Sequence, residues 1–133
     1  MTQESLTYTT ILEHVMDGMP GGILVYRADE KEEILYANSW LIHMFGCHDM
    51  DDFMAVTGGS FKSLVHPRDV EKVEKDIARQ ISSGANVFDY VNYRIFTKDG
   101  TEKTVEEFGH RIHVPHVGTV FYVFFLDSDA KYV

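Results

Sequence analysis

The chain has 133 residues, 44% of them hydrophobic and 13% aromatic, which suffices for one domain with a single core and is too little for a second. Its 21 acidic side chains against 12 basic ones give a net charge of -9, so we expect neither nucleic acid nor a membrane as a partner. One cysteine cannot form an internal disulfide, and neither a secretory signal nor a membrane-spanning apolar run is visible. We therefore expect a cytoplasmic protein.

The first part of the sequence predicts a short helix and a strand hairpin. Residues 1–10 are polar and without pattern, whereas apolar side chains recur at helical spacing over 11–16 until glycine and proline end the helix at 18–22. The apolar runs 23–26 and 34–37 are rich in β-forming residues and are separated by a polar stretch, which is typical of a hairpin with a solvated turn.

Short helices are predicted next. Asn38 directly precedes a helical pattern over 39–45, so its side-chain oxygen can accept a hydrogen bond from an amide of the first turn, and Gly46 can end that helix. Two glycines interrupt the pattern that follows, which leaves room for one or two single-turn helices around 51–55 and 61–65.

A longer amphipathic helix is predicted to begin at Pro67, which suits a first helical position. Asp69 and Glu71 add acidic groups to the first turn, and Gly84 ends the helix. Its apolar face is formed by Val70, Val73, Ile77 and Ile81.

Three strands complete the sequence. They are predicted over 87–97, over 103–113 after a turn at 98–101, and over 119–127. Two strands, several helices and three strands in this order indicate an α+β domain, with its helices gathered on one face of an antiparallel sheet.

Five segments have a characteristic order and spacing: GGILVY at 21–26, ILYANSWLIHMFG at 34–46, SLVHPRDV at 63–70, YRIFTKDGTEKTVEE at 93–107 and VFYVFFLDSDA at 120–130. Together they resemble the PAS family of sensory domains over residues 11–130. The resemblance implies a five-stranded antiparallel sheet in the order 2-1-5-4-3, cupping a cavity beneath the helices. Residues 1–10 would be an N-terminal flanking segment, and 131–133 the start of a linker to a missing output domain.

The resemblance also implies a role in signalling. The last three strands resemble PAS domains that precede bacterial diguanylate cyclase and phosphodiesterase modules, and a histidine-kinase output fits nearly as well. We therefore expect a covalently attached output domain, reached through the acidic junction at 127–129. We expect the isolated domain not to be an enzyme, because no pair of base and nucleophile is recognisable.

A cavity beneath the sheet is the expected place for a small-molecule ligand. If the turn pairs Ile95 with Val105, alternation of side chains brings Tyr93 and Glu107 to the face that covers the cavity. The candidate cavity residues are Trp40, Met44, Tyr93, Ile95, Val105, Glu107, Phe121, Val123 and Phe125.

Glu107 is the strongest candidate among them for a polar ligand-binding residue. An inward carboxylate can bind an amine or hydroxyl group of a ligand, or it can be satisfied internally by Tyr93 and a backbone amide, because a lone buried charge is costly. The internal alternative is favoured. Trp40 and Met44 can line the same cavity, although residues of these types at helical spacing are more often ordinary core.

The outer face of the sheet predicts an interface. On the last strand Tyr122, Phe124 and Leu126 point outward and are all apolar, so this face needs a cover, either a flanking helix or a second copy of the domain. We expect a homodimer through these residues. The same reasoning places Arg94 opposite Glu106 as an exposed ion pair.

Known cofactors of the family are disfavoured. Photosensory flavin members carry a reactive cysteine where this chain has 58–61, and amide side chains where it has Ile95, Val105 and Phe125. Haem-binding members use a histidine of the long helix, whereas here His66 only precedes that helix. The cofactor therefore stays open, with photochemical flavin and haem disfavoured.

No metal site or reactive thiol is predicted. His110 and His113 are three residues apart on a strand and point to opposite faces, so they cannot converge on one ion with His116 unless the strand ends early. Cys47 has no neighbouring base and orienting acid in the sequence. Two functions remain: a ligand sensor that regulates its output domain, or a ligand-free module that dimerises its host protein.

Overall fold

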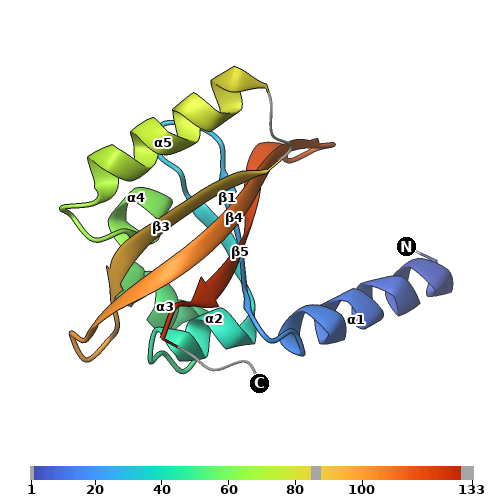
Figure 1. Ribbon diagram of the computed structural model, residues 1–133. Coiled ribbons are helices and arrows are strands. Elements are labelled where there is room, and N and C mark those ends of the chain that lie inside the picture. The colour runs from blue at the N-terminus through green and yellow to red at the C-terminus, as the bar shows by residue number, and fades with distance from the viewer. Residues whose placement is uncertain (1, 85–87, 130–133) are drawn as a thin grey trace.

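The computed structural model describes residues 2–84 and 88–129. One antiparallel sheet contains five strands in the order β2-β1-β5-β4-β3, as the resemblance implied (Figure 1). The predicted strand start at 87, domain end at 130 and linker at 131–133 lie outside the described residues. The strands are β1 (Gly22–Arg27), β2 (Ile34–Ala37), β3 (Asp89–Phe96), β4 (Glu102–Val114) and β5 (Gly118–Asp127). The helices are α1 (Gln3–Asp17), α2 (Ser39–Met44), α3 (Met50–Thr57), α4 (Phe61–Leu64) and α5 (Val70–Ser83).

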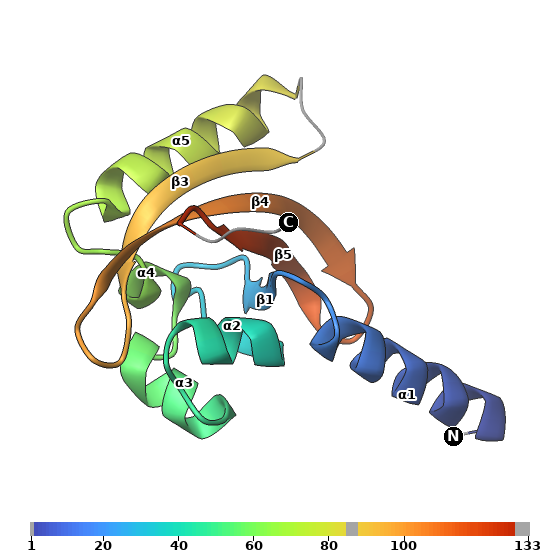
Figure 2. The same ribbon diagram turned by 60° about the horizontal axis from the view of Figure 1, so that its bottom comes forward.

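Helix α1 is longer than predicted and stands apart from the rest of the chain. It begins at Gln3 because the Thr2 hydroxyl caps it, accepting a hydrogen bond from the Ser5 amide at 3.0 Å. No residue of α1 is buried, and the helix extends away from the sheet beyond α2 (Figures 1 and 2). It therefore does not supply the cover that the outer face of the sheet was predicted to need.

Asn38 joins α1, β1 and α2 at one point. Its Oδ1 accepts hydrogen bonds from the amides of Leu41 at 3.2 Å and Ile23 at 2.9 Å, which confirms that it caps α2. Its Nδ2 donates to the carbonyl oxygens of Met16 at 2.8 Å and Gly21 at 3.1 Å. Because the side chain is fully buried, these bonds fasten the end of α1 to the body of the domain.

Helix α5 begins at Val70, three residues after the predicted start at Pro67. The cause is Asp69, whose carboxylate makes no capping bond and instead binds Arg94 of β3, with Oδ1 to Nη2 at 2.7 Å and Oδ2 to Nε at 3.0 Å. The predicted pairing of Arg94 with Glu106 is therefore wrong. The Asp69–Arg94 pair fixes the turn before α5 to the sheet, so Asp69 is not available to cap an earlier start of the helix.

The register between β3 and β4 differs from the predicted one by two residues. Ile95 pairs with Lys103 instead of Val105, because the hairpin loop spans 97–101 and its centre lies one residue earlier than that pairing requires. A shift of two residues leaves every side chain on its predicted face, whereas a shift of one would reverse them all. The assignment of inner and outer faces therefore survives the error.

Aromatic side chains fill much of the space between the helices and the inner face of the sheet. The Tyr26 ring stacks on Phe61 with centroids 4.6 Å apart and on Phe121 at 5.3 Å. Tyr93 meets Phe61 and Phe125 edge to face. Each fully buried ring of this kind stabilises the fold by about 1.5–3 kcal/mol. Among the described residues, no helix is both long and apolar enough to cross a membrane.

Candidate functional site

The nine predicted cavity residues do not all lie together. Phe121 lines a pocket beside α5, whereas Met44 lines a separate hollow of about 610 Å³ between α2 and the β3–β4 loop. Trp40 is half-buried on α2, outside the core cluster. The remaining six are at most 3% exposed and pack in the core: Tyr93, Ile95, Val105, Glu107, Val123 and Phe125.

Glu107 is fully buried on the inner face of β4. The Tyr93 hydroxyl donates a hydrogen bond to Glu107 Oε2, while Oε1 has no partner among the described residues. Burial raises the pKa of Glu107 to about 8, and the hydrogen bond from Tyr93 opposes this only in part. At neutral pH the carboxyl group is therefore mainly protonated, and of the predicted internal partners only Tyr93 binds it in the described part of the chain.

A second pocket, called here the α5 pocket, has a volume of about 280 Å³. It lies where α5 meets the ends of three strands, and its walls come from segments far apart in the sequence. Two acidic groups face it from the loop before β2 and from α5, and a cation stands on β4. The residues used below are Tyr26, Glu32, Glu74, Ile77, Ile81, Arg111 and Phe121.

Glu32 is held rigidly at this pocket. Its backbone has φ of 51°, a left-handed conformation that is uncommon outside glycine and is often found at functional sites. The Glu32 amide donates to Asp29 Oδ1 at 2.9 Å, and its carbonyl oxygen accepts from the Phe61 amide at 3.0 Å. Burial and the neighbouring Glu74 carboxyl group raise the pKa of Glu32 to about 8.

The outer face of β5 is apolar, as predicted. Phe108 of β4 and Phe124 of β5 are register partners there, and so are His110 and Tyr122, whose hydroxyl lies 2.9 Å from His110 Nδ1. Phe108 is 42% exposed and Tyr122 37% exposed, whereas Phe124 and Leu126 are half-buried. The predicted interface residues therefore lie on one face, and none of the described helices covers it.

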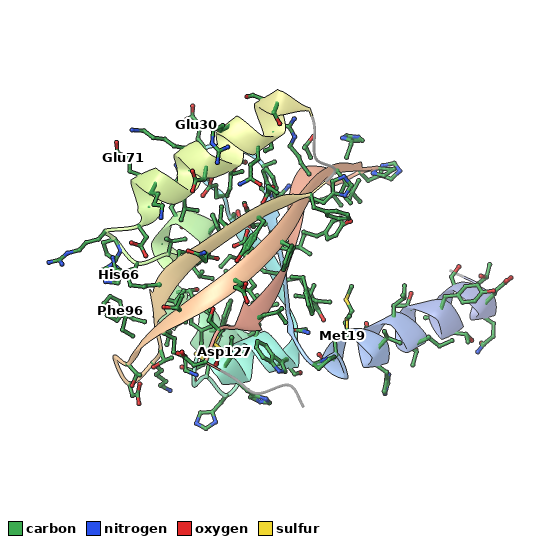
Figure 3. The ribbon with its side chains drawn as sticks, viewed as in Figure 1. Met19, Glu30, His66, Glu71, Phe96 and Asp127 are labelled. Atoms are coloured by element: carbon green, nitrogen blue, oxygen red, sulfur yellow. The ribbon has the colours of Figure 1, made fainter. Side chains whose placement is uncertain are left out.

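The histidine and cysteine residues have ordinary structural environments. His66 stacks on Phe96 with centroids 4.7 Å apart (Figure 3), its Nδ1 accepts from the Arg68 amide, and its Nε2 lies 3.2 Å from Glu102 Oε1. Burial raises the pKa of the Cys47 thiol, which disfavours the thiolate. No group of three or more metal-ligating side chains converges within the described ranges.

Comparison with known proteins agrees with this geometry. A family profile described as PAS fold matches residues 34–123, more than half of the chain. The chain is a member of the PAS family. PAS domains are sensory modules of signalling proteins, and this one has the expected sheet and helices. No match was found among curated proteins.

Solved structures support the same PAS fold. The PAS domain of a two-component sensor histidine kinase superimposes with a TM-score of 0.70 at 12% identity, covering 95% of this chain and 100% of that one. The PAS domain of an HTR-like protein from Haloarcula marismortui gives 0.71 at 20% identity, with 94% and 95% covered. A LOV protein from Rhodobacter sphaeroides gives 0.69 at 14% identity, with 99% and 71% covered. At such identities the likeness establishes the fold alone.

Sequence reasoning missed most of the α5 pocket of this PAS domain. Of its seven residues named above, only Phe121 was among the predicted cavity residues. Alternation along β1 could have placed Tyr26 on the inner face, because Leu24 and Tyr26 are buried and their neighbours are not. No signal in the sequence indicated Glu32 or Glu74, which look like ordinary solvated charges of a loop and of an amphipathic helix.

Proposed function

We propose that this PAS domain regulates a larger signalling protein by associating with a second copy of itself through α1. The observation that carries the proposal is the exposed apolar stripe of α1. Tyr8, Ile11, Leu12 and Val15 follow the i, i+3, i+4, i+7 spacing of one helix face, and each is more than half exposed. A helix of 15 residues with such a stripe and no buried residue is marginal in water on its own.

A second copy of the chain is the occupant that suits this stripe best. Two copies related by a two-fold axis bring the same stripe against itself, so each apolar residue finds an apolar partner. The outer face of the sheet, with Phe108 and Tyr122, is a second exposed apolar surface that a second copy can cover.

Asn38 supplies a route by which the PAS core reaches this interface. Its four hydrogen bonds connect the last turn of α1 with β1 and α2, so a displacement in the sheet is transmitted to the C-terminal end of α1. A signal in the core would then alter the geometry of the α1 pair, and the attached output domain would respond.

Substituting Leu12→Glu tests the proposal. The variant places a charge in the middle of the stripe, so we expect it to be monomeric in size-exclusion chromatography with light scattering. The circular dichroism signal of its β-strands should be unchanged. The control is Thr10→Glu, which adds the same charge on the opposite side of α1 and should stay dimeric. A Leu12→Glu variant that remains dimeric would reject the α1 interface.

Ligand sensing is a second candidate function. It is favoured by the α5 pocket, where carboxyl groups from two separate segments lie side by side with buried oxygen atoms that have no partner among the described residues. Such a pocket, with apolar walls and a few placed polar groups, has the character of a small-molecule site.

A further inference from the structure

The α5 pocket contains three oxygen acceptors that the described part of the chain leaves unsatisfied. Glu32 Oε1 and Glu74 Oε1 are buried and have no hydrogen-bond partner there. The third is the hydroxyl group of Tyr26, a side chain that is only 1% exposed and lines the pocket, and this hydroxyl makes no hydrogen bond within residues 2–84 and 88–129. The Glu32 and Glu74 carboxyl groups also contact each other, which contributes to the raised pKa of Glu32. Buried polar groups normally find partners, so two buried carboxyl oxygen atoms and an unbonded hydroxyl group at one pocket indicate a ligand.

The remaining walls of the pocket suit a ligand with an apolar alkyl group and a positive charge. Ile77 and Ile81 line the pocket from α5, and the rings of Tyr26 and Phe121 stack beside it with centroids 5.3 Å apart. Aromatic rings attract cations, and alkyl groups pack favourably on isoleucine. Arg111 stands in the same pocket, and no described carboxylate lies within ion-pair distance of it.

We propose that the α5 pocket binds the primary ammonium group of a small organic amine, with its nitrogen between Glu32 and Glu74. An ammonium group has three N–H donors, and once Glu32 has released its proton the pocket presents three acceptors for them: Glu32, Glu74 and the Tyr26 hydroxyl group. The apolar part of the amine packs against Ile77, Ile81 and Phe121. A volume of about 280 Å³ is near the lower end for ligand pockets and limits the ligand to a small molecule.

Arg111 restricts which amines fit. A second ammonium group would be repelled by its guanidinium group, whereas a carboxylate would pair with it. Monoamines and amino acids are therefore accepted over diamines. The inference goes beyond self-association through α1 and gives the ligand-sensing alternative its chemical class.

The electrostatics of the pocket predict how binding depends on pH. With a pKa of about 8, raised by burial and by Glu74, Glu32 carries a proton at neutral pH, although Lys62 nearby lowers that pKa in part. An incoming ammonium group favours the ionised carboxylate, so binding releases a proton. Affinity therefore increases as the pH rises from 6 to 8.

The test is an NMR titration of the isotope-labelled chain with n-butylammonium. We expect saturable shifts of backbone amide signals near Ile77, Ile81 and Phe121. Glu74→Gln should weaken binding by about tenfold or more, since it removes a charged acceptor. The control Glu71→Gln, on an exposed site of the same helix, should leave binding unchanged. Absence of saturable shifts, or equal shifts in Glu74→Gln, would overturn the proposal.

Tyr26→Phe separates ligand recognition from folding. The variant keeps the stacked ring and removes only a hydroxyl group that has no described partner, so its unfolding midpoint without ligand should not fall, whereas its affinity for n-butylammonium should. Loss of stability together with unchanged affinity would contradict the assigned role. If Glu74→Gln does not fold, Tyr26→Phe still tests whether the α5 pocket binds the ammonium group.

Other probes distinguish the possible sources of the ammonium group. Tetramethylammonium, which has no N–H donor, should bind at least about tenfold more weakly than n-butylammonium, and equal binding would overturn the site. Leucine should lose affinity in Arg111→Gln, while n-butylammonium should not. Diffusion measurements on the same samples report self-association separately: a monomer that binds the amine rejects the α1 dimer, and a dimer that does not bind it rejects only this site.

Discussion

At the scale of single residues, Glu107 is one of the groups that make stability depend on pH. Its pKa of about 8, raised chiefly by burial, is well above that of the same group in the unfolded chain. Between about pH 4.5 and 8 the unfolded chain loses this proton while the folded chain keeps it. The contribution of Glu107 to the free energy of unfolding therefore falls as the pH rises through this window and levels off above it.

Replacing Glu107→Gln should remove this contribution. Gln is similar in shape and cannot release a proton, so its free energy of unfolding should fall less steeply between pH 5 and pH 8 than that of the wild type. The difference has an upper limit of about 1.4 kcal/mol per pH unit. Urea unfolding at the two pH values measures it, with exposed Glu71→Gln as the control that keeps the wild-type slope. Equal slopes in Glu107→Gln and the wild type would mean that Glu107 is already ionised in the fold.

What sequence could predict about single residues depended on strand alternation. Glu107 and Tyr93 were placed correctly on the inner face because side chains alternate along β3 and β4 whatever the exact register. Glu32 and Glu74 could not be found in this way. They meet only because the loop before β2 folds over α4 and brings its carboxylate to α5, a contact between segments that no local pattern encodes.

At the scale of elements, an ion pair at the start of α5 and the Gln80 side chain further along it attach this helix to β3, with Gln80 exchanging two hydrogen bonds of 2.8 Å with the Tyr90 backbone. Asp69 accepts two hydrogen bonds from the Arg94 side chain and one from its backbone amide at 2.9 Å. The side-chain bonds from Arg94 are the main reason that the pKa of Asp69 is lowered to about 2. Stability from this pair is thus present above about pH 4 and is lost as the pH falls toward 2.

Substituting Asp69→Ala should therefore destabilise the fold by about 1–3 kcal/mol at pH 7, because charge-assisted bonds are lost at a half-buried site. The deficit relative to the wild type should shrink as the pH is lowered from 4 to 2. Asp76→Ala on α5 is the matched control: its ion pair with Arg79 is long at 3.5 Å and exposed, so we expect a loss of less than about 0.5 kcal/mol. Thermal unfolding of both variants measures this difference in stability. Equal losses in the two variants would contradict the role given to the Asp69–Arg94 pair.

Most elements could be predicted from the sequence, and the errors have physical causes. The strand order followed from the resemblance, and the caps at Asn38 and Gly84 marked helix boundaries correctly. The start of α5 was wrong because Asp69 is used by a distant strand. Helix α1 was predicted too short, because its first turns depend on a cap at Thr2 rather than on an apolar pattern.

At the scale of the whole molecule, residues 2–84 and 88–129 of the PAS domain form a well-filled interior and leave two apolar surfaces uncovered. Its helices α2 to α5 and the inner face of the sheet enclose one core, while α1 and the outer face carry exposed large apolar side chains. The sequence indicated the apolar outer surface of β5. Side chains alternate along this strand, and the outward ones, Tyr122, Phe124 and Leu126, are all apolar. The sequence could not indicate the direction of α1, which is set by the hydrogen bonds of Asn38.

Native mass spectrometry of the freshly purified 133-residue chain tests self-association most directly. The account predicts a predominant species with twice the mass of the chain, reduced to the single mass by Leu12→Glu and kept by Thr10→Glu. A wild-type chain that is monomeric at micromolar concentration would contradict the proposed α1 interface.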